Sequence, residues 1–93
     1  MFKTNEYFEG KVVSIGFKSE KGLATAGVMA AGEYEFGTST KEYMTITSGV
    51  MTVKLPGSNE WKSYKAYETF EVEANVKFQV KMDSDTSYIC VYE

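Results

Sequence analysis

The side chains best suited to do chemistry in this chain lie close together around Glu42. A glycine-containing loop at residues 37–41 holds the candidate hydroxyls of Thr38 and Ser39, and Glu42 follows it directly. Hydroxyls and backbone N–H groups in such a loop can hold an anion, although they can equally satisfy the loop's own backbone groups. Lys41 offers a positive charge, but in a strand it would point away from Glu42, because neighbouring side chains alternate between faces. Glu42 is therefore the candidate catalytic residue, and the alternative is a rim glutamate paired with a lysine.

Four aromatic residues are candidates to line a binding pocket: Tyr34, Phe36, Phe78 and Tyr88. Aromatic rings stack on the flat face of any nucleobase, but in a small β-domain they also form ordinary core. Trp61 follows a turn, and we expect it to pack one end of the domain or a subunit interface.

The residue types that usually bind transition metals are scarce. The chain has no histidine, and its single cysteine, Cys90, lies in an apolar strand pattern. Glu33, Glu35 and Glu42 offer oxygen ligands for a hard cation, but a transition-metal site without histidine or a cysteine cluster would be atypical. We therefore expect no metal, and a buried structural Cys90 rather than a nucleophile.

Composition predicts one globular domain. The 93 residues are 43% hydrophobic and 25% charged, and so short a chain cannot form two cores. We expect no membrane partner, because no apolar run approaches the ~20 residues of a spanning helix. Residues 1–11 lack the apolar core of a secretory signal, which with the lone cysteine predicts a cytoplasmic protein.

The charge pattern argues against a nucleic-acid partner, since the net charge is −3 and nucleic-acid backbones are bound by clustered lysines and arginines. All ten basic residues are lysines. The planar guanidinium fork that often binds phosphate is therefore absent.

The chain has the pattern of many short β-strands. Apolar residues recur with period two, as in 76–80, while residues 48–49 indicate a hairpin and residues 56–59 (Pro-Gly-Ser-Asn) the clearest turn. Residues 7–17 alternate loosely up to a polar turn at 18–22. No segment shows the stripe of a long helix, so we predict an all-β fold, a single closed barrel or a sandwich.

Glu42, followed by six residues and then Gly49, has the spacing of the first sequence motif of cupins, which are small β-barrels. The likeness implies that the Glu42 side chain points into the barrel. A closer resemblance runs along the whole chain, and its residues include 5–8 (Asn-Glu-Tyr-Phe), 14–17 (Ser-Ile-Gly-Phe), 27–29 (Gly-Val-Met), 32–34 (Gly-Glu-Tyr), 44–45 (Met-Thr) and 86–88 (Thr-Ser-Tyr). With these residues the chain resembles the small bacterial pyrimidine/purine nucleoside phosphorylases. The resemblance implies a single cupin-like domain of the jelly-roll type over residues 1–93.

The resemblance also implies a function. Members of that family split nucleosides with phosphate into a free base and ribose 1-phosphate, and are thought to act as dimers. For this chain it implies a pentosyltransferase with broad base specificity, active in nucleotide salvage, with inorganic phosphate as co-substrate and no cofactor. Glu42 would then bind ribose hydroxyls or stabilise positive charge at the anomeric carbon, as in glycoside cleavage. The substrate-binding candidates are Tyr34, Phe36, Thr38, Ser39, Phe78 and Tyr88.

Two alternatives stay open on the sequence. One is a non-catalytic cupin that binds a nucleoside or sugar, and the other is a structural dimer module. The sequence also leaves open the preferred base, the dimer interface and, without arginine or histidine, the groups that bind phosphate.

Overall fold

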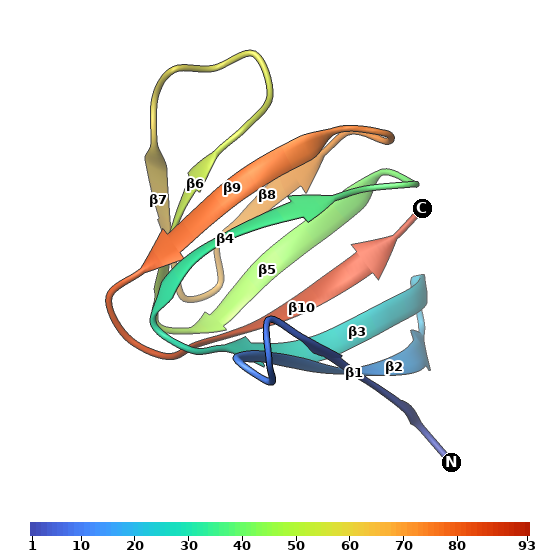
Figure 1. The fold of residues 1–93 in the computed structure, drawn as a ribbon. Coiled ribbons are helices and arrows are strands. Elements are labelled where there is room, and N and C mark those ends of the chain that lie inside the picture. Colours follow the sequence, from blue (N-terminus) through green and yellow to red (C-terminus); the bar gives the residue numbers. More distant parts are fainter.

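The computed structural model describes residues 1–93, and its strands form two antiparallel sheets (Figure 1). The strands are β1 (Lys3–Tyr7), β2 (Val12–Ser19), β3 (Gly22–Met29), β4 (Gly32–Gly37), β5 (Glu42–Ser48), β6 (Val50–Lys54), β7 (Lys62–Lys65), β8 (Thr69–Val72), β9 (Lys77–Met82) and β10 (Thr86–Tyr92). The six-stranded sheet has the order β1-β2-β3-β10-β5-β8, and the four-stranded sheet has the order β4-β9-β6-β7. The all-β, jelly-roll prediction is confirmed, although the two sheets keep separate hydrogen-bond ladders instead of closing into one barrel. No helix long and apolar enough to cross a membrane is present.

The N-terminal part differs from the expected single strand over residues 7–17. The chain turns at residues 8–11, so that β1 pairs antiparallel with β2, with Lys3 opposite Gly16 and Tyr7 opposite Val12. Phe8 and Glu9 adopt positive φ angles of 53° and 59°, and the Gly10 N–H donates to the Tyr7 carbonyl at 3.2 Å. Positive φ at both central residues is the geometry of a tight hairpin turn, which usually selects Asn or Gly. The turn was missed because Phe and Glu are not turn residues.

The core lies between the two sheets and follows the period-two pattern. Ile46 on β5, Met51 on β6 and Val80 on β9 are fully buried, and each belongs to one cluster of 14 buried residues that joins both sheets. Burial of one such side chain contributes about 1.5–3 kcal/mol relative to leaving it in water. The facing sheets are therefore held together mainly by apolar contact.

Strand β5 positions Glu42 at the interior face. Its first residue, Glu42, lies opposite Tyr92 of β10 and Val72 of β8. Because side chains alternate along a strand, Glu42 shares its face with the buried Met44 and Ile46. This register places a carboxylate on the inner side of the larger sheet.

Candidate functional site

A cavity of about 530 Å³ lies next to Glu42, in the size range of small-molecule sites. Both sheets and the β1–β2 turn contribute to its wall. It is lined by Tyr7, Phe8, Ser14, Met29, Glu35, Phe36, Gly37, Ser39, Glu42, Met44, Phe78, Tyr88, Cys90 and Tyr92. An aromatic wall with one inward carboxylate, hydroxyls and one thiol suits a neutral ligand that carries both a flat ring and hydroxyl groups.

Glu42 is half-buried and forms no ion pair. Its one hydrogen bond is with the Cys90 thiol, whose Sγ donates to Oε1 at 3.5 Å. Burial raises the pKa of the Glu42 carboxyl above its ordinary value of 4.5, and the bond from Cys90 opposes that rise only in part. The lysine-paired rim glutamate is thus not the arrangement found, and a carboxylate with free acceptor sites faces the cavity.

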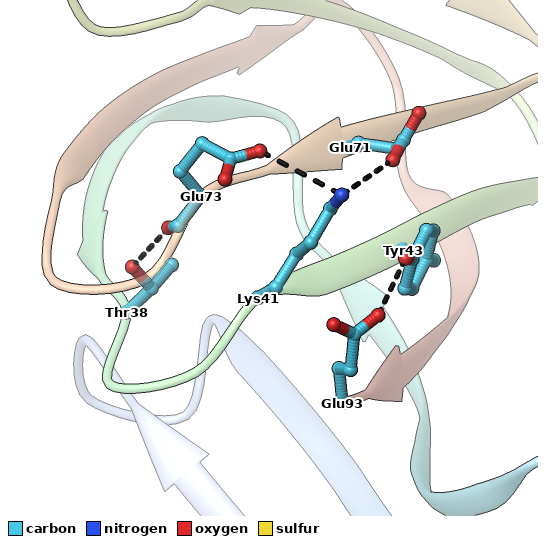
Figure 2. A network of polar contacts seen from close by, with 6 residues as sticks. All are labelled: Thr38, Lys41, Tyr43, Glu71, Glu73 and Glu93. Atoms are coloured by element: carbon cyan, nitrogen blue, oxygen red, sulfur yellow. Dashed lines mark hydrogen bonds and ion pairs between the residues drawn. The ribbon is translucent and has the colours of Figure 1, made fainter.

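Lys41 points to the other face of the sheet (Figure 2), as its place next to Glu42 in a strand predicted. Its Nζ lies 3.1 Å from Glu71 Oε1 and 3.8 Å from Glu73 Oε2. The hydrogen bond to Glu71 is the main cause that raises the pKa of Lys41. The cation closest to Glu42 in sequence is therefore held outside the cavity by two carboxylates.

Thr38 and Ser39 separate in the structure. The Thr38 hydroxyl donates to the Glu73 carbonyl at 2.7 Å (Figure 2) and accepts from the Val76 N–H at 3.1 Å. The Thr38 N–H donates to the Val76 carbonyl at 2.9 Å. These bonds tie the β4–β5 loop to the β8–β9 loop, so of the two hydroxyls only that of Ser39 lines the cavity.

The aromatic candidates divide in a similar way. Phe36, Phe78 and Tyr88 line the cavity. Tyr34 does not line it; its hydroxyl donates to the Ala30 carbonyl at 2.8 Å, and its ring packs against Phe8. Trp61 also lies outside the cavity, where the Lys81 ammonium sits 4.2 Å from its ring centroid.

The Tyr88 side chain packs directly against the backbone of Gly27, which has no side chain. A Cβ on Gly27 would come within 2.5 Å of the Tyr88 hydroxyl, so only glycine permits this close approach. Burial raises the pKa of Tyr88 to about 12. The phenol therefore stays protonated at neutral pH and can donate a hydrogen bond into the cavity.

Cys90 is buried and lies between Tyr88 and Tyr92 on the inner face of β10. Burial and the neighbouring Glu42 carboxylate raise the pKa of the Cys90 thiol. Since the thiolate is the reactive form, the thiol is inert, in agreement with the structural role expected for it.

The structure adds cavity residues that the sequence analysis did not select. Tyr92 comes from the C-terminal strand, and its hydroxyl lies 3.1 Å from Thr25 Oγ1. Its period-two spacing from Tyr88 and Cys90 was a usable signal. Tyr7 and Phe8 had no such signal, because the unusual turn at residues 8–11 carries them to the cavity. Phe8 packs against Tyr34 and Phe36, with ring centroids 4.9 and 5.6 Å apart.

Glu35 and Glu42 are the only charged residues on the border of the cavity. Only Glu42 directs its carboxylate inward, because Glu35 alternates with the inward Phe36 and accepts a hydrogen bond from Gln79 Nε2 at 3.4 Å on the outer face of β4. No group of three or more Cys, Asp or Glu side chains is placed to hold a metal ion. The cavity is therefore acidic, which favours a neutral or cationic ligand over an anion.

Comparison with known proteins places the chain in a family. The family model for pyrimidine/purine nucleoside phosphorylases matches residues 2–92. The chain belongs to this family. A relative from Alcanivorax borkumensis named pyrimidine/purine nucleoside phosphorylase is 62% identical over 92 residues, which are 99% of this chain and 98% of that protein.

Solved structures agree with the family assignment. A protein of unknown function from Vibrio parahaemolyticus superposes with a TM-score of 0.93 at 40% identity, over 97% of this chain and 96% of the other. An RmlC-like cupin from Shewanella frigidimarina superposes with a TM-score of 0.77 at 16% identity, over 99% of this chain and 83% of its own. The second likeness shows the cupin fold alone.

Proposed function

We propose that this member of the nucleoside phosphorylase family cleaves nucleosides with inorganic phosphate, as a pentosyltransferase of broad base specificity. The C1′–N bond of the nucleoside breaks, a phosphate oxygen bonds to C1′, and the proton of hydrogen phosphate ends on the released base. The products are a free base and ribose 1-phosphate. The reaction passes through a sugar with oxocarbenium character, by analogy with glycoside cleavage.

The observation that carries the proposal is the position of Glu42. In a chain that matches the family from residue 2 to residue 92, this carboxylate is half-buried, unpaired and exposed to a ligand-sized cavity. A carboxylate in such a place binds ribose hydroxyls in the ground state and stabilises positive charge at C1′ in the transition state.

The other cavity residues have supporting roles in this proposal. Phe8, Phe36 and Phe78 offer ring faces to the base, and stacking accepts purines and pyrimidines alike because every base has a π-face. Tyr88 and Ser39 offer hydroxyls to the sugar or base. Positioning and fixed charge supply the rate gain, so we propose that no metal or organic cofactor takes part.

The test is phosphate-dependent release of base. Inosine, uridine and cytidine are each incubated with the purified chain, with and without phosphate, and free base and ribose 1-phosphate are measured. We expect equal amounts of both products only with phosphate, and a loss of at least about 100-fold in kcat/KM in Glu42→Ala, in the range of lost transition-state electrostatics. Glu33→Gln, an exposed carboxyl outside the cavity, is the matched control. No release from any nucleoside at high protein concentration would contradict the proposal.

One observation favours a second candidate, a non-catalytic cupin that binds a nucleoside or a sugar. The 14 residues that line the cavity include no cation to hold phosphate. A ligand that binds only the folded chain raises its Tm, so a nucleoside-dependent Tm rise without base release would select the binder.

We propose a homodimer that forms through the outer face of the larger sheet. Ile15 and Val28 are 45% and 51% exposed, and they pair across β2 and β3 with neighbours on the same face. The outward positions of β2, β3 and β10 carry no charge, and are Val13, Ile15, Phe17, Ala24, Ala26, Val28, Ser87, Ile89 and Val91. An apolar patch of this kind is typical of protein–protein interfaces.

Light scattering tests the dimer. We expect wild type to have the mass of two chains and the Ile15→Glu/Val28→Glu double variant to have the mass of one. Lys65→Glu, on the exposed part of β7, is the control that should stay dimeric. A wild-type monomer, or a dimer that survives both glutamates, would refute this interface.

The cellular setting follows from the same proposal. A single free thiol, Cys90, needs no oxidising compartment, and nucleoside cleavage is a step of nucleotide salvage. We therefore propose a cytoplasmic salvage enzyme that binds no nucleic acid. Its net charge is −3, which gives no electrostatic attraction to a phosphate backbone.

A further inference from the structure

The proposed reaction consumes phosphate, yet the Glu42 cavity is a poor place for a dianion. Its only inward charged side chain is the Glu42 carboxylate, and no cation lines it. In the β4–β5 loop, Lys41 is held by Glu71 and Glu73, and the Thr38 hydroxyl and N–H are used by backbone partners or the adjoining loop. Phosphate therefore needs a cationic place that adjoins the cavity.

Such a place exists beside β1. A groove of about 570 Å³ is lined by eleven residues, which include Lys3 and Lys18 and no Asp or Glu. Neither lysine takes part in an ion pair, since both ion pairs of the structure belong to Lys41. Two free ammonium groups without an opposing carboxylate create a positive potential that attracts an anion.

The groove is continuous with the Glu42 cavity through shared and bonded residues. Tyr92 lines both. Asn5, which lines the groove, lies with its Nδ2 3.5 Å from the Oγ of Ser14, which lines the cavity. On β2, Gly16 stands between Ser14 and Lys18 on the same face and has no side chain to separate them. The C-terminal end of β10 and the β2–β3 turn lie at the same end of the molecule (Figure 1).

The hydroxyl pair at the boundary suits an anion as well. Tyr92 Oη and Thr25 Oγ1 are 3.1 Å apart, and either can donate to the other. A hydroxyl carries one proton and two acceptor sites, so whichever group accepts this bond keeps its own proton for a further acceptor. Thr25 lines the groove and Tyr92 lines both hollows, so that proton is available where the two meet.

We propose that the phosphate co-substrate binds in this groove, held by Lys3 and Lys18 and by the Tyr92–Thr25 hydroxyl pair, and attacks the ribose from there. This inference rests on the proposed phosphorylase function. A phosphate oxygen forms the new bond to C1′ of a nucleoside seated against Glu42. The electron pair of the C1′–N bond leaves with the base, which takes the proton of hydrogen phosphate. The two lysines then bind the phosphate in the groove, and Glu42 binds the nucleoside in the adjoining cavity.

The first test separates the two substrates kinetically. Lys3→Gln, Lys18→Gln and the double variant are compared with Lys65→Gln, an exposed lysine on β7 in the other sheet. We expect the double variant to raise the KM for phosphate by about tenfold or more, as the loss of charged hydrogen bonds implies, and to change the KM for nucleoside by less than about twofold. The Lys3→Arg/Lys18→Arg pair, which keeps both charges, should keep most phosphate affinity. An unchanged KM for phosphate in the double variant would overturn the inference and leave the phosphorylase function standing.

The second test does not need turnover. Inorganic phosphate alone is titrated into ¹⁵N-labelled protein, and the amide shifts are followed. We expect saturable shifts at residues 3, 16, 18 and 25 that are lost in the double variant and kept in Lys65→Gln. Shifts confined to residues 37–41, or no saturable shift, would refute the groove. If wild type cleaves no nucleoside, the phosphorylase function fails, and this titration still decides whether the groove binds phosphate.

Discussion

Residues 41–43, at the start of β5, place their side chains in two opposite environments on the two faces of the larger sheet. Outside the sheet, Lys41 makes two ion pairs and the Tyr43 hydroxyl donates to Glu93 Oε2 at 2.6 Å (Figure 2). Inside, Glu42 is half-buried and has no cation, only the Cys90 thiol at 3.5 Å. Two carboxylates on the outer face have an ammonium as partner, whereas the carboxylate on the inner face has none.

The outer ion pairs and the inner carboxylate differ in what they contribute. Exposed ion pairs contribute little to stability, so the outer network holds the loops in place without marking a site. An unpaired carboxylate in a partly buried position disfavours its own charged form. Such a cost is typical of residues kept for binding or catalysis, and it supports our proposal that the inner face of β5 carries the functional site.

The largest expected effect comes from filling the inner face at Gly27. In Gly27→Val the new side chain collides with the Tyr88 ring, whose hydroxyl would lie 2.5 Å from the Cβ. We expect a loss of about 2–3 kcal/mol in the free energy of unfolding, the range for overpacking, with loss of activity as Tyr88 is displaced. Urea denaturation and base release measure the two effects.

The matched control for Gly27→Val is Ala26→Val on the outer face of β3. Because Ala26 is one residue away and points out of the core, its effect on the monomer's stability should be less than about 1 kcal/mol. Equal losses of unfolding free energy at the two positions would show that any larger side chain on β3 is destabilising, whichever face it occupies.

A smaller effect is expected in the pH dependence of stability. Burial raises the folded-state pKa of Glu42 above its ordinary value of 4.5, so the folded chain holds this proton more tightly than the unfolded chain does. The contribution of Glu42 to stability is thus greatest below its unfolded pKa and falls as the pH rises through its folded pKa. As the pH rises above the ordinary value of 4.5, wild type should lose stability relative to Glu42→Gln. A difference that is constant with pH, measured by urea denaturation, would contradict a raised pKa.

The smallest effect is expected at Lys41. Since its partners Glu71 and Glu73 are exposed, Lys41→Gln should change Tm by less than about 2 °C and leave kcat/KM for nucleoside unchanged. Calorimetry and the base-release assay check both. A loss of activity similar to that of Glu42→Ala would place Lys41 in the reaction and remove the contrast between the faces.

The sequence predicted what depends on local periodicity. The spacing of the cupin motif predicted that Glu42 points inward, and alternation along the strand predicted that Lys41 points outward. The hairpin predicted at Ser48–Gly49 was wrong, because β5 and β6 belong to different sheets and do not pair; the chain turns there, with Gly49 at a φ of 92°, to cross from one sheet to the other. It did not predict the turn at Phe8–Glu9, because positive φ at these residues is set by packing of Phe8 on Tyr34 and Phe36 rather than by turn propensity. It also could not show that Thr38 bonds to the β8–β9 loop, or that Tyr92 lines both hollows, since both depend on contacts between distant segments.

The most direct test of the account compares Glu42→Gln with Glu71→Gln, an isosteric loss of charge on opposite faces of the same sheet. Both are assayed for phosphate-dependent base release and for Tm at pH 7.5. We expect Glu42→Gln to lose at least about 100-fold in kcat/KM while its Tm rises, because the buried charge is removed, and Glu71→Gln to keep its activity without a rise in Tm. Full activity in Glu42→Gln, or the same loss in both variants, would contradict the claim that the unpaired inner carboxylate carries the reaction.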